Sequence, residues 1–349
     1  MNLQFLTADD AAWGEFLARV RHDFYHLPAY AQLMAPFDGG QAEAVLVRDG
    51  DQHFFLPYIV RPLSHIAWLG GEGGKLFDVV SPYGYPGPLI AGDPTYVGQA
   101  VAQWIRAMRL RGAVSGFVRL HPLLNVDTAI LAAEGEIISR GRTVSADLML
   151  PPEELWRQTS ATHRNEISKA RRHGLSVAMD ESFEHLPTFI GMYYETMDRA
   201  GASQYYYFPQ EYFHGLRDCL REKLSLCIVK GPDNAVLCGA LFTECDGIVQ
   251  YHLSATFNAA LPLHPAKLML DWVRSWAQKR GNRVLHLGGG MGAREDSLFN
   301  FKARFSSLRH PYYTWQLLFD PDTYRGLENR RRAQRENEVD AQFFPIYRS

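Results

Sequence analysis

Apolar residues recur along the chain at two spacings, the three-to-four spacing of helices and the alternation of strands, and together they predict a mixed α/β protein. Because strands that form hairpins come first and a helical crossover comes later, we expect a mixed sheet rather than a doubly wound parallel sheet. The predicted helices span residues 8–20, 28–34, 153–173, 185–200, 209–222 and 265–280; the strands span 176–179, 248–255, 283–287 and 312–319; and hairpins occupy 43–60 and 225–242.

Three features of this pattern occur twice, in the same order and at offsets of about 170 to 180 residues, which predicts a duplicated domain. Pro151 and Pro152 mark the boundary between the copies, because two consecutive prolines cannot continue a strand. The first domain is expected at 1–150, with residues 320–349 packing back on it, and the second at 151–319. The paired features are aromatic-proline helix starts at 24–30 and 207–213, hairpins at 45–57 and 227–241, and helix–glycine–strand units at 104–122 and 272–288.

One segment interrupts the regular pattern. Residues 77–90 contain three prolines and two glycines among aromatic residues, so a regular ladder strand is not expected there. We predict a shaped loop that presents Tyr83 and Tyr85, because rigid tyrosine-rich loops line binding sites at low entropic cost. A packed connection without a binding role is the alternative.

Composition narrows the class of protein. The chain has 349 residues, a net charge of -2 and the apolar content of an ordinary globular protein, so the overall charge does not indicate a nucleic-acid binder. No apolar run approaches the roughly 20 residues of a membrane span, and the N-terminus lacks the features of a signal peptide, so a cytoplasmic location is expected. Four cysteines without CxxC spacing are expected to be buried thiols rather than metal ligands: Cys219, Cys227, Cys238 and Cys245.

Basic residues gather in two segments. Between residues 157 and 173 Glu166 is the only acid, and Arg164, Arg171 and Arg172 share one side of the predicted helix. A solvated helix face and a phosphate-contacting face both remain open for this run. In the second run, residues 325–335, the arginines are mixed with Glu328, Glu336 and Glu338, which favours a surface helix.

The strongest indication of chemistry lies near the C-terminus. A predicted strand at 283–287 ends in Gly288, Gly289 and Gly290, where backbone can approach a ligand closely, and the next segment carries Lys302 between two phenylalanines. The alternative for this lysine is a structural one, with its aliphatic stem lying between the two rings. The histidines, including His252, His264 and His286, form no convincing nucleophile triad with a serine or cysteine.

In four segments the chain resembles the Fem family of peptidoglycan-bridge aminoacyltransferases and the wider group of acetyltransferase-fold (GNAT-like) acyltransferases. The segments are residues 81–88, 163–177, 250–255, and 287–290 with 297–305. The resemblance implies tandem GNAT-like folds with the acceptor in a cleft between them, and transfer of an amino acid from aminoacyl-tRNA to an amine of a peptidoglycan precursor. The long coiled-coil arm of the staphylococcal enzymes is absent from the pattern, as it is from the shorter members.

The resemblance also suggests site residues. The family's Phe-Lys pair contacts the terminal adenosine of the donor and the reacting ester, a role that Phe301 and Lys302 would take. Tyr251 matches a tyrosine that lines the catalytic cleft, and Asp78 is a candidate for holding the acceptor amine, with turn capping as its alternative. The remaining candidates are Gly288, Gly289, Gly290, Arg164, Asn165 and Lys169 for the donor, and Tyr83, Tyr85 and Arg199 for the acceptor.

The identity of the donor is weighed from phosphate chemistry. A CoA enzyme of this fold binds pyrophosphate with a glycine-rich turn at a helix N-terminus, but residues 261–269 contain no glycine, and Pro262 and Pro265 each remove a backbone donor. In the first domain Asp93 would repel the phosphate. Aminoacyl-tRNA is therefore the favoured donor, with no tightly bound cofactor and no metal expected.

Three hypotheses follow. The first is an amide-forming aminoacyltransferase that acts on an amine of a cell-envelope precursor or of a peptide natural product. The second is an acyl-CoA-dependent N-acyltransferase that acts on a sugar amine or a polysaccharide precursor. The third is a pseudoenzyme of the same fold that only binds an envelope partner.

Overall fold

The computed structural model describes residues 1–124, 126–334 and 343–349, and its chain forms two compact units. Unit 1 comprises Met1–Arg140 and Tyr312–Ser349, and unit 2 comprises Gly141–Pro311. The sequence-based prediction puts the two boundaries at 150 and 319 instead. Both observed boundaries fall inside strands, so two strands run from one unit into the other: β7 (Glu136–Asp147) and β13 (Leu308–Leu318).

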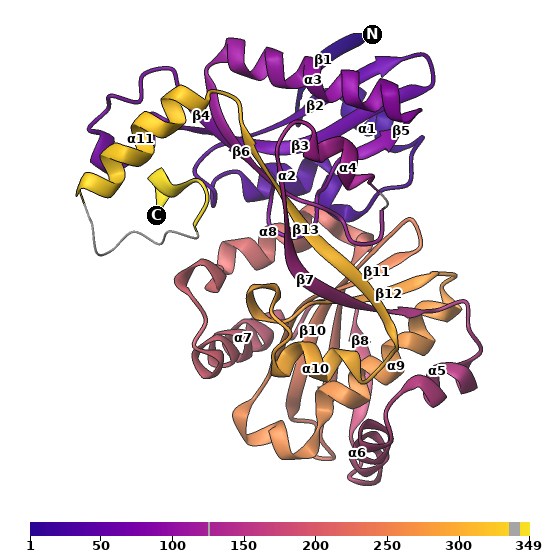
Figure 1. The fold of residues 1–349 in the computed structure, drawn as a ribbon. Coiled ribbons are helices and arrows are strands. Elements are labelled where there is room, and N and C mark those ends of the chain that lie inside the picture. Colours follow the sequence, from indigo (N-terminus) through magenta and orange to yellow (C-terminus); the bar gives the residue numbers. More distant parts are fainter. Residues whose placement is uncertain (125, 335–342) are drawn as a thin grey trace. The chain divides into compact units, whose positions relative to one another are not determined.

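Unit 1 contains a mixed sheet in the order β1-β2-β3-β4-β6-β13, in which β4 and β6 form the parallel pair among the described strands. The long helix α3 covers one face of this sheet and buries Trp104 in the apolar core, and α1 packs Trp13 and Phe16 against Phe55 on the other face (Figure 1). Its elements are β1 (Asn2–Thr7), α1 (Ala11–Leu17), α2 (Pro28–Met34), β2 (Gln41–Asp49), β3 (Gln52–Pro62), β4 (Phe77–Val80), β5 (Leu89–Ala91), α3 (Pro94–Arg111), β6 (Ala113–Arg119), α4 (Thr128–Ala132) and α11 (Pro321–Gln334).

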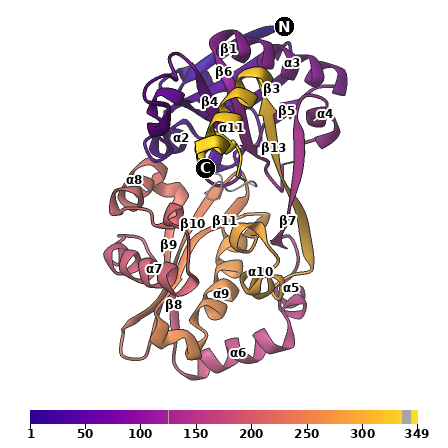
Figure 2. The same cartoon turned by 60° about the vertical axis from the view of Figure 1, so that its left-hand side comes forward.

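Unit 2 repeats this arrangement with the order β8-β9-β10-β11-β12-β7, in which β11 and β12 form the parallel pair. Helices α9 and α10 lie on one face of the sheet and α7 and α8 on the other (Figure 2). Its elements are α5 (Pro152–Gln158), α6 (Ala161–Arg172), β8 (Ser176–Asp180), α7 (Leu186–Ala200), α8 (Gln210–Leu220), β9 (Leu224–Lys230), β10 (Val236–Cys245), β11 (Ile248–Thr256), α9 (Pro265–Lys279), β12 (Val284–Gly288) and α10 (Ser297–Ala303).

The matching strand orders confirm the predicted duplication and the mixed α/β fold. In each unit a hairpin is followed by a third strand, a crossover helix and a parallel strand, and the sixth strand is supplied by the segment of chain that comes from the other unit. Thr314–Leu318 of β13 pair with β6, and Val144–Asp147 of β7 pair with β12.

Local signals explain where the crossover helix of unit 1 begins and ends. The Asp93 side chain accepts a hydrogen bond from the Tyr96 N–H at 2.8 Å, and Pro94 occupies the first turn, where its missing N–H costs nothing. The helix ends at Gly112, whose φ of 93° is a left-handed conformation that glycine adopts readily.

Two predicted elements need correction. The helix expected over 153–173 is two helices, α5 and α6, because Ser160 caps a new helix by accepting a hydrogen bond from the His163 N–H. The segment 77–90 is irregular only in its middle. Phe77–Val80 form strand β4 because the first proline, Pro82, comes after them and leaves their N–H groups available for the ladder.

None of the helices in the described part of the chain combines the length and the apolar character that a membrane span requires.

Candidate functional site

The parallel pair in unit 2 separates partway along its length. β11 and β12 pair through Ile248–Gln250 and Val284–His286, and β11 then continues to Thr256 without further pairing to β12 among the described residues. Two parallel strands that part in this way leave backbone N–H and C=O groups that a ligand can meet. Gly288 is the last residue of β12, and Gly289 and Gly290 follow it.

Glycine is favoured at each of these three positions for a different physical reason. Gly288 adopts a φ of 74°, and a Cβ on Gly289 would lie 3.1 Å from the Arg142 carbonyl oxygen. A Cβ on Gly290 would lie 2.2 Å from Asp296 Oδ1, so this glycine is required by the loop itself. Asp296 holds the loop together, since its carboxylate accepts hydrogen bonds from the Met291 and Phe299 N–H groups at 2.9 Å each. Donor binding by the glycines stays a prediction.

Lys302 lies beside these glycines. The side chain comes from α10 and is only 8% exposed, and its Nζ donates a hydrogen bond to the Gly289 carbonyl oxygen at 2.6 Å. Burial lowers the pKa of Lys302 to about 8, with Asp296 opposing the shift. The structure therefore holds a buried cation, still largely protonated at neutral pH, at the place where the chain leaves β12.

Tyr251 is brought to the same place from the other strand. It is the first residue of β11 beyond the paired segment, and the centroid of its ring lies 5.9 Å from Lys302 Nζ. The ring stacks on Phe242 of β10 at 5.4 Å. Burial raises the pKa of the Tyr251 phenol, so the hydroxyl stays neutral and can donate a hydrogen bond.

Phe301 precedes the lysine and packs on α6. Its carbonyl oxygen accepts a hydrogen bond from His163 Nε2 at 3.1 Å, and its ring lies 5.6 Å from the imidazole and 5.7 Å from Phe305. Burial, together with the nearby charge of Lys267, lowers the pKa of His163 to about 4, which keeps the imidazole neutral. Phe301 and Lys302 thus lie on a helix whose position α6 fixes.

Sequence reasoning missed the positioning role of His163, because the residue stands in a basic run. The available signal was its spacing: His163, Ile167 and Ala170 lie at four- and three-residue intervals, and all three are buried on one face of α6.

The other α6 candidates are not brought to Lys302. The Arg164 guanidinium donates to the carbonyl oxygens of Thr159 and Arg157, so it closes the turn between α5 and α6. Asn165 and Lys169 are exposed on the helix surface. Arg171, which the sequence grouped with Arg164, forms an ion pair with Asp271 at 2.6 Å. Two of the three arginines expected to form a phosphate-contacting side are therefore engaged within the protein.

Arg199 lies in unit 2 at the end of α7. Its guanidinium donates to the Thr256 carbonyl oxygen at 3.1 Å, to Thr196 Oγ1 at 3.2 Å and to Asn258 Oδ1, so it fixes the end of β11. Its predicted contact with the acceptor is not tested by these interactions.

The candidates from the first half of the chain belong to unit 1. Tyr83 and Tyr85 are half-buried; the Tyr83 carbonyl oxygen accepts a hydrogen bond from the Tyr30 hydroxyl at 2.9 Å, and the Tyr85 ring packs edge-on against Tyr25 at 5.7 Å. The loop between them is tight, since a Cβ on Gly84 would lie 2.0 Å from the Tyr25 ring. The tyrosine loop is rigid, as both interpretations of the sequence require.

Asp78 is fully buried in unit 1, and its carboxylate already has three partners. Arg61 Nε donates to Oδ1 at 2.8 Å, and Arg348 Nε and the Tyr347 hydroxyl donate to Oδ2. These contacts join β4 to the C-terminal segment within unit 1, whereas Lys302 belongs to unit 2.

The two crossover helices differ from a phosphate-binding helix start. In unit 1 the Asp93 carboxylate occupies the N-terminus of α3. In unit 2 α9 begins with Pro265, and the Glu166 carboxylate lies 2.6 Å from Lys267 Nζ and 3.8 Å from His264 Nε2 at the same helix start. An anionic ligand gains little where a carboxylate is already held.

None of the four cysteines forms a disulfide. Burial raises the thiol pKa of Cys219 and of Cys238 to about 12 and raises that of Cys227 as well, so these three carry no reactive thiolate.

No protein-family model matches the chain, and no curated protein matches its sequence. Solved structures do match its fold. The match with the structure of FemX covers 93% of this chain and 99% of the FemX chain at 14% identity, with a TM-score of 0.69. The match with L-PGS from Bacillus licheniformis covers 89% of this chain and 92% of that chain at 12% identity, with a TM-score of 0.56. The match with the C-terminal domain of a putative lysylphosphatidylglycerol synthetase from Agrobacterium fabrum covers 87% of this chain and 90% of that chain at 15% identity, with a TM-score of 0.53.

At these identities the likeness is one of fold, and it extends over nearly the whole of this chain and of FemX. Together with the repeated strand order of the two units, it shows that the chain has the fold of FemX, built from two units of matching topology.

Proposed function

We propose that the protein is an amide-forming acyltransferase that moves an aminoacyl group from aminoacyl-tRNA to an amine of a cell-envelope precursor or of a peptide-like natural product. The observation that carries the proposal is the buried Lys302 ammonium, held by the Gly289 carbonyl oxygen and lying beside Tyr251 where β11 and β12 separate. The overall likeness to FemX supports it.

The chemistry asks little of a protein beyond positioning and charge. The aminoacyl ester is already activated, so the acceptor amine attacks its carbonyl carbon, the C–N bond forms, and the C–O bond to the ribose breaks. The proton of the attacking amine leaves with the ribose oxygen. Lys302 supplies positive charge to the developing oxyanion or to that ribose oxygen, and a pKa of about 8 also suits it to exchange a proton there.

The two helix starts favour a donor without a CoA pyrophosphate. Asp93 already accepts the Tyr96 N–H, and Glu166 lies against Lys267 and His264 at the start of α9. An acyl-CoA donor would have to place its pyrophosphate beside one of these carboxylates, with fewer free N–H groups than the motif supplies.

The donor is tested directly with purified protein. We expect transfer of a labelled amino acid from charged tRNA to an amine acceptor in a filter assay, and a higher melting temperature with aminoacyl-tRNA, because a ligand that binds only the native state stabilises it. Acetyl-CoA is the matched control and should leave the melting temperature unchanged. Stabilisation by acetyl-CoA, with acetyl transfer and no response to charged tRNA, would establish the acyl-CoA alternative instead.

The pH dependence of transfer should report the ionisation of Lys302. Its pKa is lowered to about 8, so the ammonium is present below that pH and is lost as the pH rises through it. We expect kcat/KM to fall above about pH 8, although deprotonation of the acceptor amine acts in the opposite direction. Because an arginine does not titrate in this range, any transfer retained by Lys302→Arg should show no such fall. A wild-type profile that keeps rising to pH 10 would contradict a role for the cation.

A further inference from the structure

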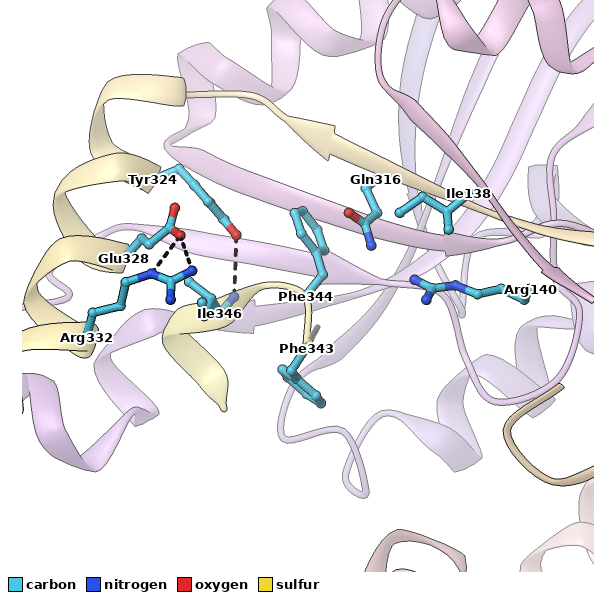
Figure 3. A pocket seen from close by; sticks show the side chains of 9 residues that line it. All are labelled: Ile138, Arg140, Gln316, Tyr324, Glu328, Arg332, Phe343, Phe344 and Ile346. Atoms are coloured by element: carbon cyan, nitrogen blue, oxygen red, sulfur yellow. Dashed lines mark hydrogen bonds and ion pairs between the residues drawn. The ribbon is translucent and has the colours of Figure 1, made fainter. Parts of the chain in front are cut away.

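Unit 1 contains a cavity of about 320 Å³ that has no part in the proposed transfer chemistry. Helix α11 forms one side with Glu328 and Arg332, the strands β7 and β13 form the other with Ile138, Arg140 and Gln316, and Phe343 comes from the C-terminal segment (Figure 3). Its volume lies at the lower end of the roughly 300–1,000 Å³ typical of small-molecule sites.

The C-terminal wall of this cavity is held in place by buried contacts. Phe344 stacks on Tyr324 of α11 with ring centroids 5.7 Å apart, and the Ile346 N–H donates to the Tyr324 hydroxyl at 3.4 Å. Tyr347 is anchored by three hydrogen bonds: its carbonyl oxygen accepts from Trp68 Nε1 at 2.9 Å, its hydroxyl donates to Asp78 at 3.1 Å, and the same hydroxyl is bonded to Ser115 Oγ at 2.7 Å. A wall fixed in this way gives a preformed site, which lowers the entropic cost of binding.

The charged groups that line the cavity are unbalanced. Glu328 accepts hydrogen bonds from Arg332 at 2.9 and 3.1 Å, so those two charges compensate each other. Arg140 has no carboxylate partner among the described residues: its Nε donates to Thr314 Oγ1 at 2.9 Å, and its guanidinium lies 6.0 Å from the Phe117 ring. The described lining residues therefore carry one net positive charge, and a half-buried guanidinium such as that of Arg140 is suited to a carboxylate.

We propose that this cavity binds the carboxylate end of an apolar amino-acid residue. The carboxylate would pair with Arg140, the Gln316 amide would meet a neighbouring polar group of the ligand, and Ile138 and Phe343 would contact its apolar side chain. The single net charge matches a monocarboxylate. A phosphate monoester, with about 1.5 to 2 negative charges, would bring excess negative charge close to Glu328.

The test uses the purified full chain and isothermal titration calorimetry with N-acetyl-phenylalanine as the probe. We expect saturable binding of the acid and none of its methyl ester, which has the same apolar body without the charge. One further probe, a dipeptide with C-terminal phenylalanine, separates the two sources of the carboxylate. It binds as well as N-acetyl-phenylalanine if a peptide end is the ligand, and it does not bind if the ligand is a free metabolite.

Three variants and a control connect binding to the cavity. Arg140→Gln and Arg332→Gln should weaken binding, the first by about tenfold or more because a hydrogen bond to a charged group is lost. Glu328→Gln should tighten binding several-fold, since it removes the only negative charge among the described residues of the lining. Arg325→Gln makes the same change on the same helix at a residue outside the cavity and should have no effect. Equal binding of acid and ester, no saturable binding, or an unchanged affinity in Arg140→Gln would overturn the proposal.

Discussion

Replacing Lys302 with alanine is expected to lower the rate of aminoacyl transfer by about 100- to 1,000-fold, the loss typical for removal of a group that stabilises an oxyanion. The Nζ is buried and fixed on the Gly289 carbonyl oxygen, so no exposed lysine can take its place. Single-turnover transfer from charged tRNA measures the loss. The melting temperature, measured on the same preparation, shows whether the variant is folded.

A second variant separates the charge from the packing. Lys302→Met keeps an unbranched apolar stem and removes a charge that burial penalises, so we expect a melting temperature at least equal to that of the wild type, with transfer as low as in the alanine variant. Lys279→Met makes the same change at an exposed position in unit 2 and should leave transfer unchanged. If Lys302→Met transferred at the wild-type rate, Lys302 would be a structural lysine whose stem packs beside Phe301.

Elements with local signals were predicted well from the sequence. The hairpins, the helix starts at Pro28 and Pro265 and the glycine after α3 depend on residues within a few positions of one another, and the structure has them at those places. The helix break at Ser160 also has a local signal, an N-cap residue, but the basic run that continues across it concealed the break.

Contacts between distant segments could not be read in the same way. That β7 completes the sheet of unit 2 and β13 that of unit 1 depends on which edge each strand meets, and sequence periodicity does not specify a partner. For the same reason Arg164 appeared free to contact a phosphate, although its guanidinium is held by two backbone carbonyl oxygens.

Lys302 and Tyr251 show what a motif and a resemblance can provide. A strand that ends in glycines, followed by a lysine between aromatic residues, pointed to this part of the chain, and the structure places the lysine ammonium 5.9 Å from the centroid of the Tyr251 ring. The burial that lowers the lysine pKa comes from the packing of α10 and could not be seen in the sequence.

Asp78→Ala should have the largest effect on stability, lowering the free energy of unfolding of unit 1 by about 3–5 kcal/mol, because it leaves two largely buried guanidinium groups without their carboxylate. The loss also removes one of the two hydrogen bonds of the Tyr347 hydroxyl, which keeps its bond to Ser115 Oγ at 2.7 Å. Urea denaturation followed by tryptophan fluorescence measures the change, and limited proteolysis should show earlier cleavage of the C-terminal segment.

The matched control for Asp78 is Glu72, which forms an ion pair with Arg330 of α11 at the surface of the same unit. Because the side chains of both partners are about half exposed or more, Glu72→Ala should lower the free energy of unfolding by no more than about 1 kcal/mol. An equally small loss of stability in Asp78→Ala would show that the buried cluster does not anchor the C-terminal segment.

The same variant tests the separate prediction that Asp78 holds the acceptor amine, when transfer is measured per folded molecule. A wild-type rate in the folded fraction leaves Asp78 only its structural role, whereas a loss of transfer in that fraction assigns Asp78 to the acceptor.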